Sequence, residues 1–307
     1  MKQTLLLSSM ALLLASCYQA PLEDAMPDAE PQAATKQFTF TIKGDFTNPE
    51  FATGNDTNLP LSGGTDTDNS SKAQTRAYMQ ADGAEMTDLW VIDYKDGAIR
   101  QELHQSPTDA DWGAPTMALT LGTHHILFLA SRGSQPTYSD GKVTWTKPLD
   151  TFYTDYEVTV VNTSNGNRAV TLDRCATKMQ LYVEDAIATG TTAISFTPTT
   201  WYNGWDMLTA SPIAAGGYRV SWSIPSSTIG KTGINFTAWS LSAKEEWLTD
   251  VRVVSETAGG TNADVTIPNV PLMANRATIY RGNLYTTSSA SSITLNATWQ
   301  SAYEGVY

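Results

Sequence analysis

Residues 89–103 read Leu89-Trp90-Val91-Ile92-Asp93-Tyr94-Lys95-Asp96-Gly97-Ala98-Ile99-Arg100-Gln101-Glu102-Leu103, and this stretch indicates the fold class. Two runs with strand-forming residues flank the pair Asp96-Gly97. An Asp-Gly pair in such a place is a strong signal for a two-residue β-hairpin, because both central residues of that turn need positive φ angles. We therefore predict two antiparallel strands joined at Asp96-Gly97.

Strand-forming runs separated by turn residues continue along the chain on both sides of this hairpin. Turn signals recur at Asp140-Gly141 and Asn165-Gly166, and no sustained helical period occurs after the first residues. Short strands between regular turn signals predict an all-β chain built of β-sandwiches rather than parallel sheets. The further strand-like runs are His125–Leu129, Val143–Thr146, Tyr156–Val161, Tyr218–Ile224, Ile234–Leu241, Val251–Val254, Ala263–Ile267 and a terminal hairpin of Ala277–Tyr285 with Ile293–Trp299.

The chain length predicts two domains. About 290 residues remain after the leader described below, which is enough for two separate hydrophobic cores. The turn Asn165-Gly166-Asn167 offers a boundary, so we predict an N-terminal sandwich domain of residues 37–167 and a C-terminal one of residues 168–307.

The first predicted strand is Phe38–Ile42, in which apolar and polar residues alternate strictly. It places Phe38, Phe40 and Ile42 on one face. A polar segment of residues 44–75, rich in Gly, Asn, Asp, Ser and Thr, follows this strand. A connection of this length without an element of its own is usually functional or disordered.

The N-terminus has the pattern of an export signal. A lysine at position 2 precedes an apolar run that is too short to cross a bilayer as a permanent helix. Leu14-Ala15-Ser16-Cys17 resembles the lipobox of bacterial lipoproteins. This resemblance implies a signal peptide of residues 1–16 and a lipid on Cys17, with an acidic flexible tether of residues 17–36.

Charge and cysteine content restrict the partners and the chemistry. The formal net charge is −12, which argues against nucleic acid or anionic lipid as the main partner. If Cys17 carries lipid, Cys175 has no cysteine partner in the chain. Alternate positions from Cys175 to Val183 are apolar, so we predict a buried structural thiol rather than a reactive one.

No pattern of catalytic, cofactor-binding or metal-ligating residues is present in the sequence. The histidines are His104, His124 and His125, and none belongs to a recognised motif. His124 and His125 occupy adjacent strand positions and so point to opposite faces, which keeps them from sharing one metal. We interpret both as sheet-surface or turn histidines and expect a non-enzymatic protein without cofactor or metal.

Trp201-Tyr202-Asn203-Gly204-Trp205 permits two interpretations. Trp201, Tyr202 and Trp205 could form an exposed platform that stacks on sugar rings, which would make the chain a surface glycan-binding lipoprotein. Large aromatic residues also fill sandwich cores and the loops that cover them. The sequence leaves both interpretations open.

Taken in order, these features resemble the Bacteroidales-type fimbrillins and fimbrial anchor subunits, which build type V pili. Each motif is loose by itself, but their order extends over nearly the whole chain after the leader. The matching stretches are the lipobox, the strand Phe38–Ile42, Thr75-Arg76-Ala77, residues 89–97, 121–128 and 172–178, Ala274-Asn275-Arg276-Ala277-Thr278-Ile279-Tyr280, and Leu295-Asn296-Ala297-Thr298-Trp299.

The resemblance implies two transthyretin-like β-sandwich domains and polymerisation by β-strand donation. In that family a surface protease cuts after a basic residue in the loop that follows the first strand, and Arg76 occupies the matching position here. The strand carrying Phe38, Phe40 and Ile42 is then lost, and a neighbour's strand fills its groove.

The donor implied by this resemblance is a neighbour's C-terminal strand. Its apolar positions Ile293, Leu295, Ala297 and Trp299 share one face. The implied partners are other fimbrial subunits, in a homo- or heteropolymer that supports adhesion, and the outer membrane through the lipid. Anchor subunits escape the cut and stay lipidated, so the anchor, stalk and tip roles remain open.

Overall fold

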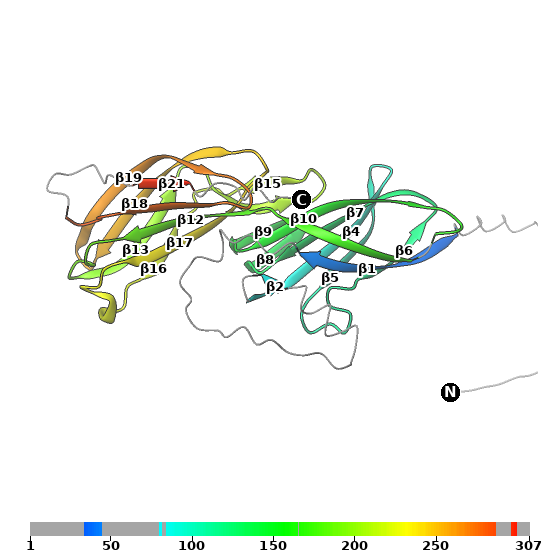
Figure 1. Ribbon diagram of the computed structural model, residues 1–307, viewed down its shortest axis with the longest axis horizontal. Coiled ribbons are helices and arrows are strands. Elements are labelled where there is room, and N and C mark those ends of the chain that lie inside the picture. The colour runs from blue at the N-terminus through cyan, green and yellow to red at the C-terminus, as the bar shows by residue number, and fades with distance from the viewer. Residues whose placement is uncertain (1–33, 45–79, 82–83, 165, 287–295, 300–307) are drawn as a thin grey trace, which may run out of the picture. The chain divides into compact units, whose positions relative to one another are not determined.

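We describe the protein in a computed structural model that covers residues 34–44, 80–81, 84–164, 166–286 and 296–299. Strands dominate this part of the chain, and the 3₁₀ turn η1 (Ser226–Thr228) is its one helical element (Figure 1). None of the described residues forms a helix of the length and apolarity that a membrane crossing requires. The prediction of an all-β fold is confirmed.

The largest sheet has seven strands that come from residues 35–174. Its order is β5 (Ala98–Gln105), β4 (Asp88–Lys95), β7 (Gly122–Ser131), β10 (Thr151–Val160), β11 (Asn167–Arg174), β1 (Thr35–Gly44) and β6 (Thr116–Thr120). A separate ribbon of two short strands is formed by β2 (Gln80–Ala81) and β3 (Ala84–Glu85).

Three four-stranded sheets contain most of the remaining strands. The first has the order β15 (Ser211–Ala214), β14 (Tyr202–Asp206), β9 (Lys142–Lys147) and β8 (Ser134–Ser139). The second has the order β16 (Val220–Ser223), β13 (Thr191–Pro198), β18 (Trp247–Thr257) and β19 (Gly260–Leu272). The third has the order β17 (Ile234–Leu241), β12 (Ala176–Val183), β20 (Ala277–Gly282) and β21 (Asn296–Trp299).

The hairpins form where the Asp-Gly signals predict them. Asp96 and Gly97, between β4 and β5, have φ angles of 52° and 75°. Asp140 and Gly141, between β8 and β9, have φ angles of 50° and 76°. Both turns place two consecutive residues at positive φ, which is the geometry that Asp-Gly tolerates best. The terminal hairpin is also present, because β20 pairs antiparallel with β21.

The seven-stranded sheet closes on itself as a sandwich. β10 and β11 pair only at Phe152–Arg174 and Tyr153–Asp173, and beyond this short contact the strands diverge. Side chains from β4, β7 and β10 then meet side chains from β1, β6 and β11 in one buried cluster, which we call the first core. Its members are Phe38, Phe40, Ile42, Met86, Leu89, Val91, Trp112, Met117, Leu119, Ile126, Phe128, Ala130, Phe152, Val158, Val160, Val170 and Leu172.

Strands β4 and β7 are buried on both faces. Alternate residues such as Val91 and Phe128 face the first core, whereas Trp90 and Leu129 belong to a second cluster on the other face. That cluster also includes Trp145 of β9 and therefore packs the sheet β15-β14-β9-β8 against β4 and β7. The near-continuous apolar run Leu89–Ile92 reflects this double burial.

The strands that follow Arg174 build a further core between the sheets β17-β12-β20-β21 and β16-β13-β18-β19. It contains Met179 of β12, Phe196 of β13, Phe236 of β17 and Val253 of β18. A β-sandwich is therefore present in this half of the chain as well.

Two of the sheets are mixed, because β1 pairs parallel with β11 and β12 pairs parallel with β20. The expected boundary after residue 167 falls at the start of β11, whose Val170 and Leu172 pack in the first core. The cluster that contains Trp90 and Trp145 also includes Cys175 and Ala176, and Met179 of β12 is the first residue of the further core.

Candidate assembly site around strand β1

Strand β1, the blue arrow in Figure 1, lies between two strands that are distant from it in sequence. Residues Thr39–Gly44 pair parallel with Asn167–Leu172 of β11. Residues Thr35–Thr39 pair antiparallel with Thr116–Thr120 of β6. The β6 side of this ladder continues backward, since Phe40 and Ile42 donate their N–H groups to the carbonyls of Pro115 (2.9 Å) and Gly113 (3.0 Å). β1 is therefore an interior strand with hydrogen bonds on both edges.

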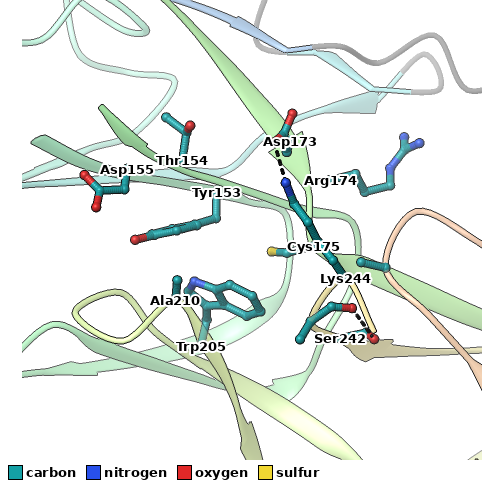
Figure 2. Close-up of a pocket in the computed structure, with 12 residues that line it drawn as sticks. Tyr153, Thr154, Asp155, Asp173, Arg174, Cys175, Trp205, Ala210, Ser242 and Lys244 are labelled. Atoms are coloured by element: carbon teal, nitrogen blue, oxygen red, sulfur yellow. Dashed lines mark hydrogen bonds and ion pairs between the residues drawn. The ribbon is translucent and has the colours of Figure 1, made fainter. Parts of the chain in front are cut away.

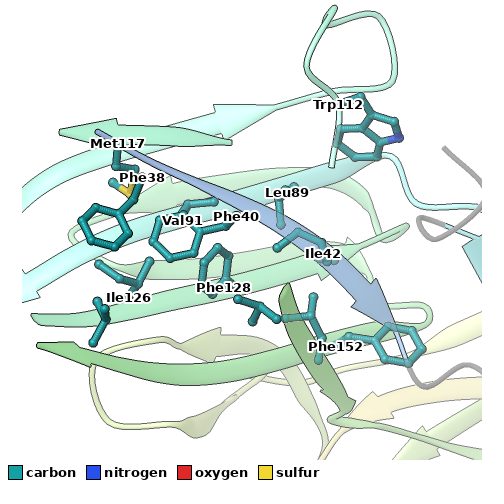
Figure 3. Packing of buried hydrophobic residues seen from close by; sticks show 14 of the residues in the cluster. Phe38, Phe40, Ile42, Leu89, Val91, Trp112, Met117, Ile126, Phe128 and Phe152 are labelled. Atoms are coloured by element: carbon teal, nitrogen blue, oxygen red, sulfur yellow. The ribbon is translucent and has the colours of Figure 1, made fainter. Parts of the chain in front are cut away.

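One face of β1 supplies the centre of the first core. Phe38, Phe40 and Ile42 are each 0% exposed, as the alternating pattern predicts. The Phe40 ring lies edge-on to Phe128, with centroids 5.3 Å apart, and the Phe38 ring stacks at 6.2 Å from Phe40. Figure 3 shows these side chains projecting from β1 among the residues of the opposite layer. Withdrawing β1 would open an apolar slot through the middle of the sandwich.

The edges of the slot fit closely around β1. The hydroxyl groups of Thr39 and Thr116 lie 3.0 Å apart, and the guanidinium of Arg168 lies 5.1 Å from the centre of the Phe38 ring. Thr39 also donates its N–H to the Gly166 carbonyl at 2.5 Å. A strand that replaced β1 would need the same alternation of large apolar and small polar side chains.

The withdrawal of β1 would leave two facing strand edges without partners. β11 and β6 would each present unpaired N–H and C=O groups, and buried backbone groups without hydrogen bonds are costly. Such an opening is a strong template for another extended chain. The arrangement can therefore support exchange of one strand for another.

The C-terminal strand lies at the edge of its own sheet. β21 pairs with β20 from Thr278–Trp299 to Arg281–Asn296 and has no second neighbour among the described strands. Of the predicted donor residues, Ala297 and Trp299 fall within β21, whereas Ile293 and Leu295 lie outside the described residues. Cys17 and Arg76, the expected lipid and protease sites, also lie outside them.

The interpretation of Trp201, Tyr202 and Trp205 as an exposed aromatic platform is wrong. Trp201 and Trp205 are only 2% and 3% exposed and belong to different buried clusters. The Trp201 indole N–H donates to the Trp239 carbonyl at 2.8 Å, and Tyr202 is only partly exposed. Neither indole presents a face to a sugar ring, because both rings are packed among the other residues of their buried clusters.

A pocket of about 440 Å³ lies beside the same region, with Tyr153, Cys175 and Trp205 in its wall (Figure 2). The Tyr153 hydroxyl donates to the Met207 carbonyl at 2.7 Å, and the Cys175 thiol points to the Thr151 carbonyl at 3.4 Å. Burial raises the pKa of the Cys175 thiol well above its ordinary value. The prediction of a buried, unpaired Cys175 is confirmed.

The histidines differ from each other more than the sequence indicates. His124 and His125 point to opposite faces as predicted, but His124 is only 1% exposed and so is not a surface residue. Its Nδ1 lies 2.6 Å from Asp93 Oδ1, whereas His125 pairs with Asp155 in a solvent-accessible position. The described residues contain no group of three or more His, Cys, Asp and Glu side chains arranged to hold a metal ion.

The predicted strand runs omit both neighbours of β1, which are β6 and β11. The β6 sequence Thr116-Met117-Ala118-Leu119-Thr120 does alternate, and Met117 and Leu119 are buried. That alternation is a usable signal, but the strand has only five residues and follows a series of turns between Ser106 and Ala114.

Comparison with known proteins gives likenesses of structure only. No model of a protein family matches the sequence, and no curated protein matches it either. The chain is similar in structure to a candidate adhesin from Bacteroides ovatus, with 10% identity, coverage of 88% of this chain and 96% of that chain, and a TM-score of 0.49. It is also similar to the fimbrial anchor protein Mfa2 from Porphyromonas gingivalis, with 10% identity, coverage of 70% and 90%, and a TM-score of 0.46. A third is a candidate polysaccharide-binding protein from Bacteroides thetaiotaomicron, with 11% identity, coverage of 85% and 95%, and a TM-score of 0.45.

Proposed function

We propose that this chain is a non-enzymatic subunit or anchor of a cell-surface fimbria, held at the outer membrane by a lipid on Cys17. Assembly proceeds by exchange of β1 for a strand of a neighbouring subunit, and the polymer supports adhesion. The observation that carries this proposal is the position of β1. It is an N-terminal strand that fills the centre of a core and pairs on both edges with strands distant in sequence.

The energetics of β1 suit a strand that is retained until a competitor arrives. Burial of a large apolar side chain contributes roughly 1.5–3 kcal/mol, so Phe38, Phe40 and Ile42 together contribute roughly 5–8 kcal/mol as an upper estimate. That is comparable to the stability of a whole domain. A cut in the chain after β1 would therefore leave it bound, and only another strand with similar side chains would displace it.

Limited proteolysis tests the exchange directly. A trypsin-like protease should cut at Arg76 early, because polar connections are common sites of nicking. If the chain is a polymerising subunit, the cut protein should form oligomers, and truncation before Ile293 should prevent them. Oligomers that form equally well from uncut Arg76→Ala protein would refute strand exchange at this site.

If the chain is an anchor, cleavage at Arg76 is not needed for assembly, and a different result is expected. Cells that carry Arg76→Ala in an anchor should display the same number of filaments as the wild type. Cys17→Ala should abolish lipid labelling and release either kind of subunit from membranes. A Cys17→Ala protein that stays with membranes in detergent-free fractions would contradict the lipid anchor.

A further inference from the structure

We propose that His124 and Lys95 fix strand β6 to the opposite layer, so that the slot keeps its shape when β1 leaves. This inference rests on the proposed function, because it assigns to these residues a role in accepting the incoming strand. They are positioning residues for the slot, since their hydrogen bonds go to Thr120 and Leu121 at the end of β6.

Strand β6 depends on β1 for its sheet hydrogen bonds. It lies at the end of the seven-strand order, and β1 is its one sheet neighbour within the described chain. Met117 and Leu119 of β6 pack in the first core together with side chains of β1. Once β1 is gone, these two side chains are therefore only partly buried. Without other contacts, β6 would then be held only by this remaining burial and by its chain connection to β7 through Leu121.

His124 holds the C-terminal end of β6. The side chain projects from β7, and its Nε2 lies 2.9 Å from the Thr120 carbonyl oxygen. Its Nδ1 lies 2.6 Å from Asp93 Oδ1, on β4. A carboxylate and a carbonyl oxygen only accept hydrogen bonds, so both contacts are hydrogen bonds when both ring nitrogens carry protons. Asp93 thus orients the ring, and the ring holds Thr120.

Lys95 contacts the same end of β6 from the next strand. Its Nζ donates to the Thr120 hydroxyl at 2.9 Å and to the Leu121 carbonyl at 2.5 Å. The fit is close, since a Cβ built on Gly122 would lie 2.9 Å from Nζ. Thr120 and Leu121 are therefore bound by two side chains from β4 and β7, which keep their own pairing whether or not β1 is present.

Gln105 makes a similar contact at the other end of the strand. Its side chain, buried on β5, donates to the Asp111 carbonyl at 3.0 Å and accepts from the Gly113 N–H at 3.2 Å. Gly113 is also a residue whose carbonyl accepts a hydrogen bond from β1. Both ends of the segment that lines the slot are thus attached to the opposite layer.

The consequence is a preformed acceptor. A strand that enters a disordered slot must order β6 as it binds, and that ordering reduces affinity and slows association. A strand that enters a slot with β6 already in place avoids this cost. The contacts of His124 and Lys95 should therefore act on association more than on dissociation.

The test uses the whole chain with a site for a specific protease inserted between Gly44 and Gln80. After cleavage, a fluorophore on the N-terminal fragment reports its release when an excess of unlabelled fragment competes for the slot, and its rebinding when labelled fragment is added to the emptied chain. The variant is Lys95→Met, which keeps the aliphatic length and leaves the buried Asp93 and His124 paired. The matched control is Lys142→Met, which removes an amine that pairs with Asp206 at 3.4 Å on a different sheet. Thr120→Val serves as a second variant that removes only the hydroxyl contact.

We expect Lys95→Met to slow rebinding by about tenfold and to change release by less than about twofold, since two hydrogen bonds are lost from the empty state. Thr120→Val should slow rebinding less, and Lys142→Met should match the wild type. Faster release with unchanged rebinding in Lys95→Met, or equal behaviour of the two lysine variants, would overturn the inference. A cleaved wild-type chain that neither releases its fragment to an excess of the unlabelled competitor nor rebinds it would refute strand exchange itself, and the inference with it.

Discussion

Gly166 and Gln37 lie so close together that a Cβ built on Gly166 would come within 2.1 Å of the Gln37 carbonyl oxygen. Neither backbone is free to retreat, because Thr39 donates its N–H to the Gly166 carbonyl and β1 continues directly into its ladder with β11. A residue with a side chain at position 166 therefore forces β1 away from its place. The glycine is required by close approach of two chains rather than by an unusual φ angle.

Gly166→Ala should consequently destabilise the pairing of β1 with Gly166 and β11. Overpacking of this kind costs about 1–3 kcal/mol, and urea denaturation of the intact chain measures it. Gly216→Ala is the control, since a Cβ at Gly216 meets nothing within 4 Å. If the two variants unfold at the same urea concentration, Gly166 and the Gln37 carbonyl do not approach each other closely enough to exclude a side chain.

Phe40→Ala should have the largest effect of any single change in β1. The ring contacts both Phe128 and Tyr156, so its removal leaves a cavity in the first core. Truncation of a buried phenylalanine costs about 3–5 kcal/mol. Thr41→Ala, on the opposite face of the strand, should cost much less. Calorimetry of both variants tests this difference, and a similar loss in each would mean that the core does not depend on the inward face of β1.

The sequence was sufficient to predict β1 and the hairpins because their signals are local. Alternation over Phe38–Ile42 reports which face of a strand is buried, and Asp-Gly reports a turn that only a few residue pairs can form. Both signals depend on neighbouring residues alone. The burial of the Cys175 thiol could be predicted in the same way, because apolar residues alternate along the sequence around it.

The pairing of β1 could not be predicted in the same way. Its partners Asn167–Leu172 and Thr116–Thr120 are far away in sequence, and nothing in an alternating pattern specifies which other strand lies alongside. The parallel direction of β1 relative to β11 is likewise a property of the connections. For the same reason the sequence did not show that β11, which begins at the expected boundary, returns to the first core.

Burial of a second sheet face explains why Trp205 is not exposed, whereas Trp201 is buried in the core between the sheets β17-β12-β20-β21 and β16-β13-β18-β19. A two-layer sandwich leaves one face of each sheet to solvent, where aromatic residues would be exposed. Here the sheet β15-β14-β9-β8 covers the second face of β4 and β7, and Trp205 fills the space between them. His124 is polar but faces the end of the first core. Its contact with Asp93 depends on the pairing of β4 with β7, which the sequence pattern does not specify.

Asp150→Asn should strongly destabilise the fold. Asp150 accepts two hydrogen bonds from Arg174, at 2.7 and 2.9 Å, and both side chains are fully buried. Neutralising one member of a buried pair leaves the other charge without compensation, which typically costs about 3–5 kcal/mol. Chemical denaturation measures this loss. The double replacement Asp150→Leu with Arg174→Met should recover part of it, and a double variant less stable than the single one would show that the charges support more than each other.

The last prediction concerns alkaline pH and Cys175. Burial, and secondly the nearby Asp150 carboxylate, raise the pKa of this thiol well above its usual range. The folded chain therefore keeps the proton to a higher pH than the unfolded chain, whose thiol titrates at about 8.5. Folding stability should be fully present below that pH and should fall as the pH rises above it, because the unfolded state is then favoured by losing its proton.

Tyrosines add to this loss at higher pH. Burial also raises the pKa of Tyr218, to about 12, so its contribution begins only near the ordinary tyrosine value of about 10. In a Cys17→Ala background, Cys175 is the one thiol of the chain. Urea denaturation at pH 7 and at pH 9.5 should show a decline that the further change Cys175→Ala removes. A thiol reagent should react with Cys175 only after unfolding, and rapid reaction in native buffer would contradict both its burial and the raised pKa.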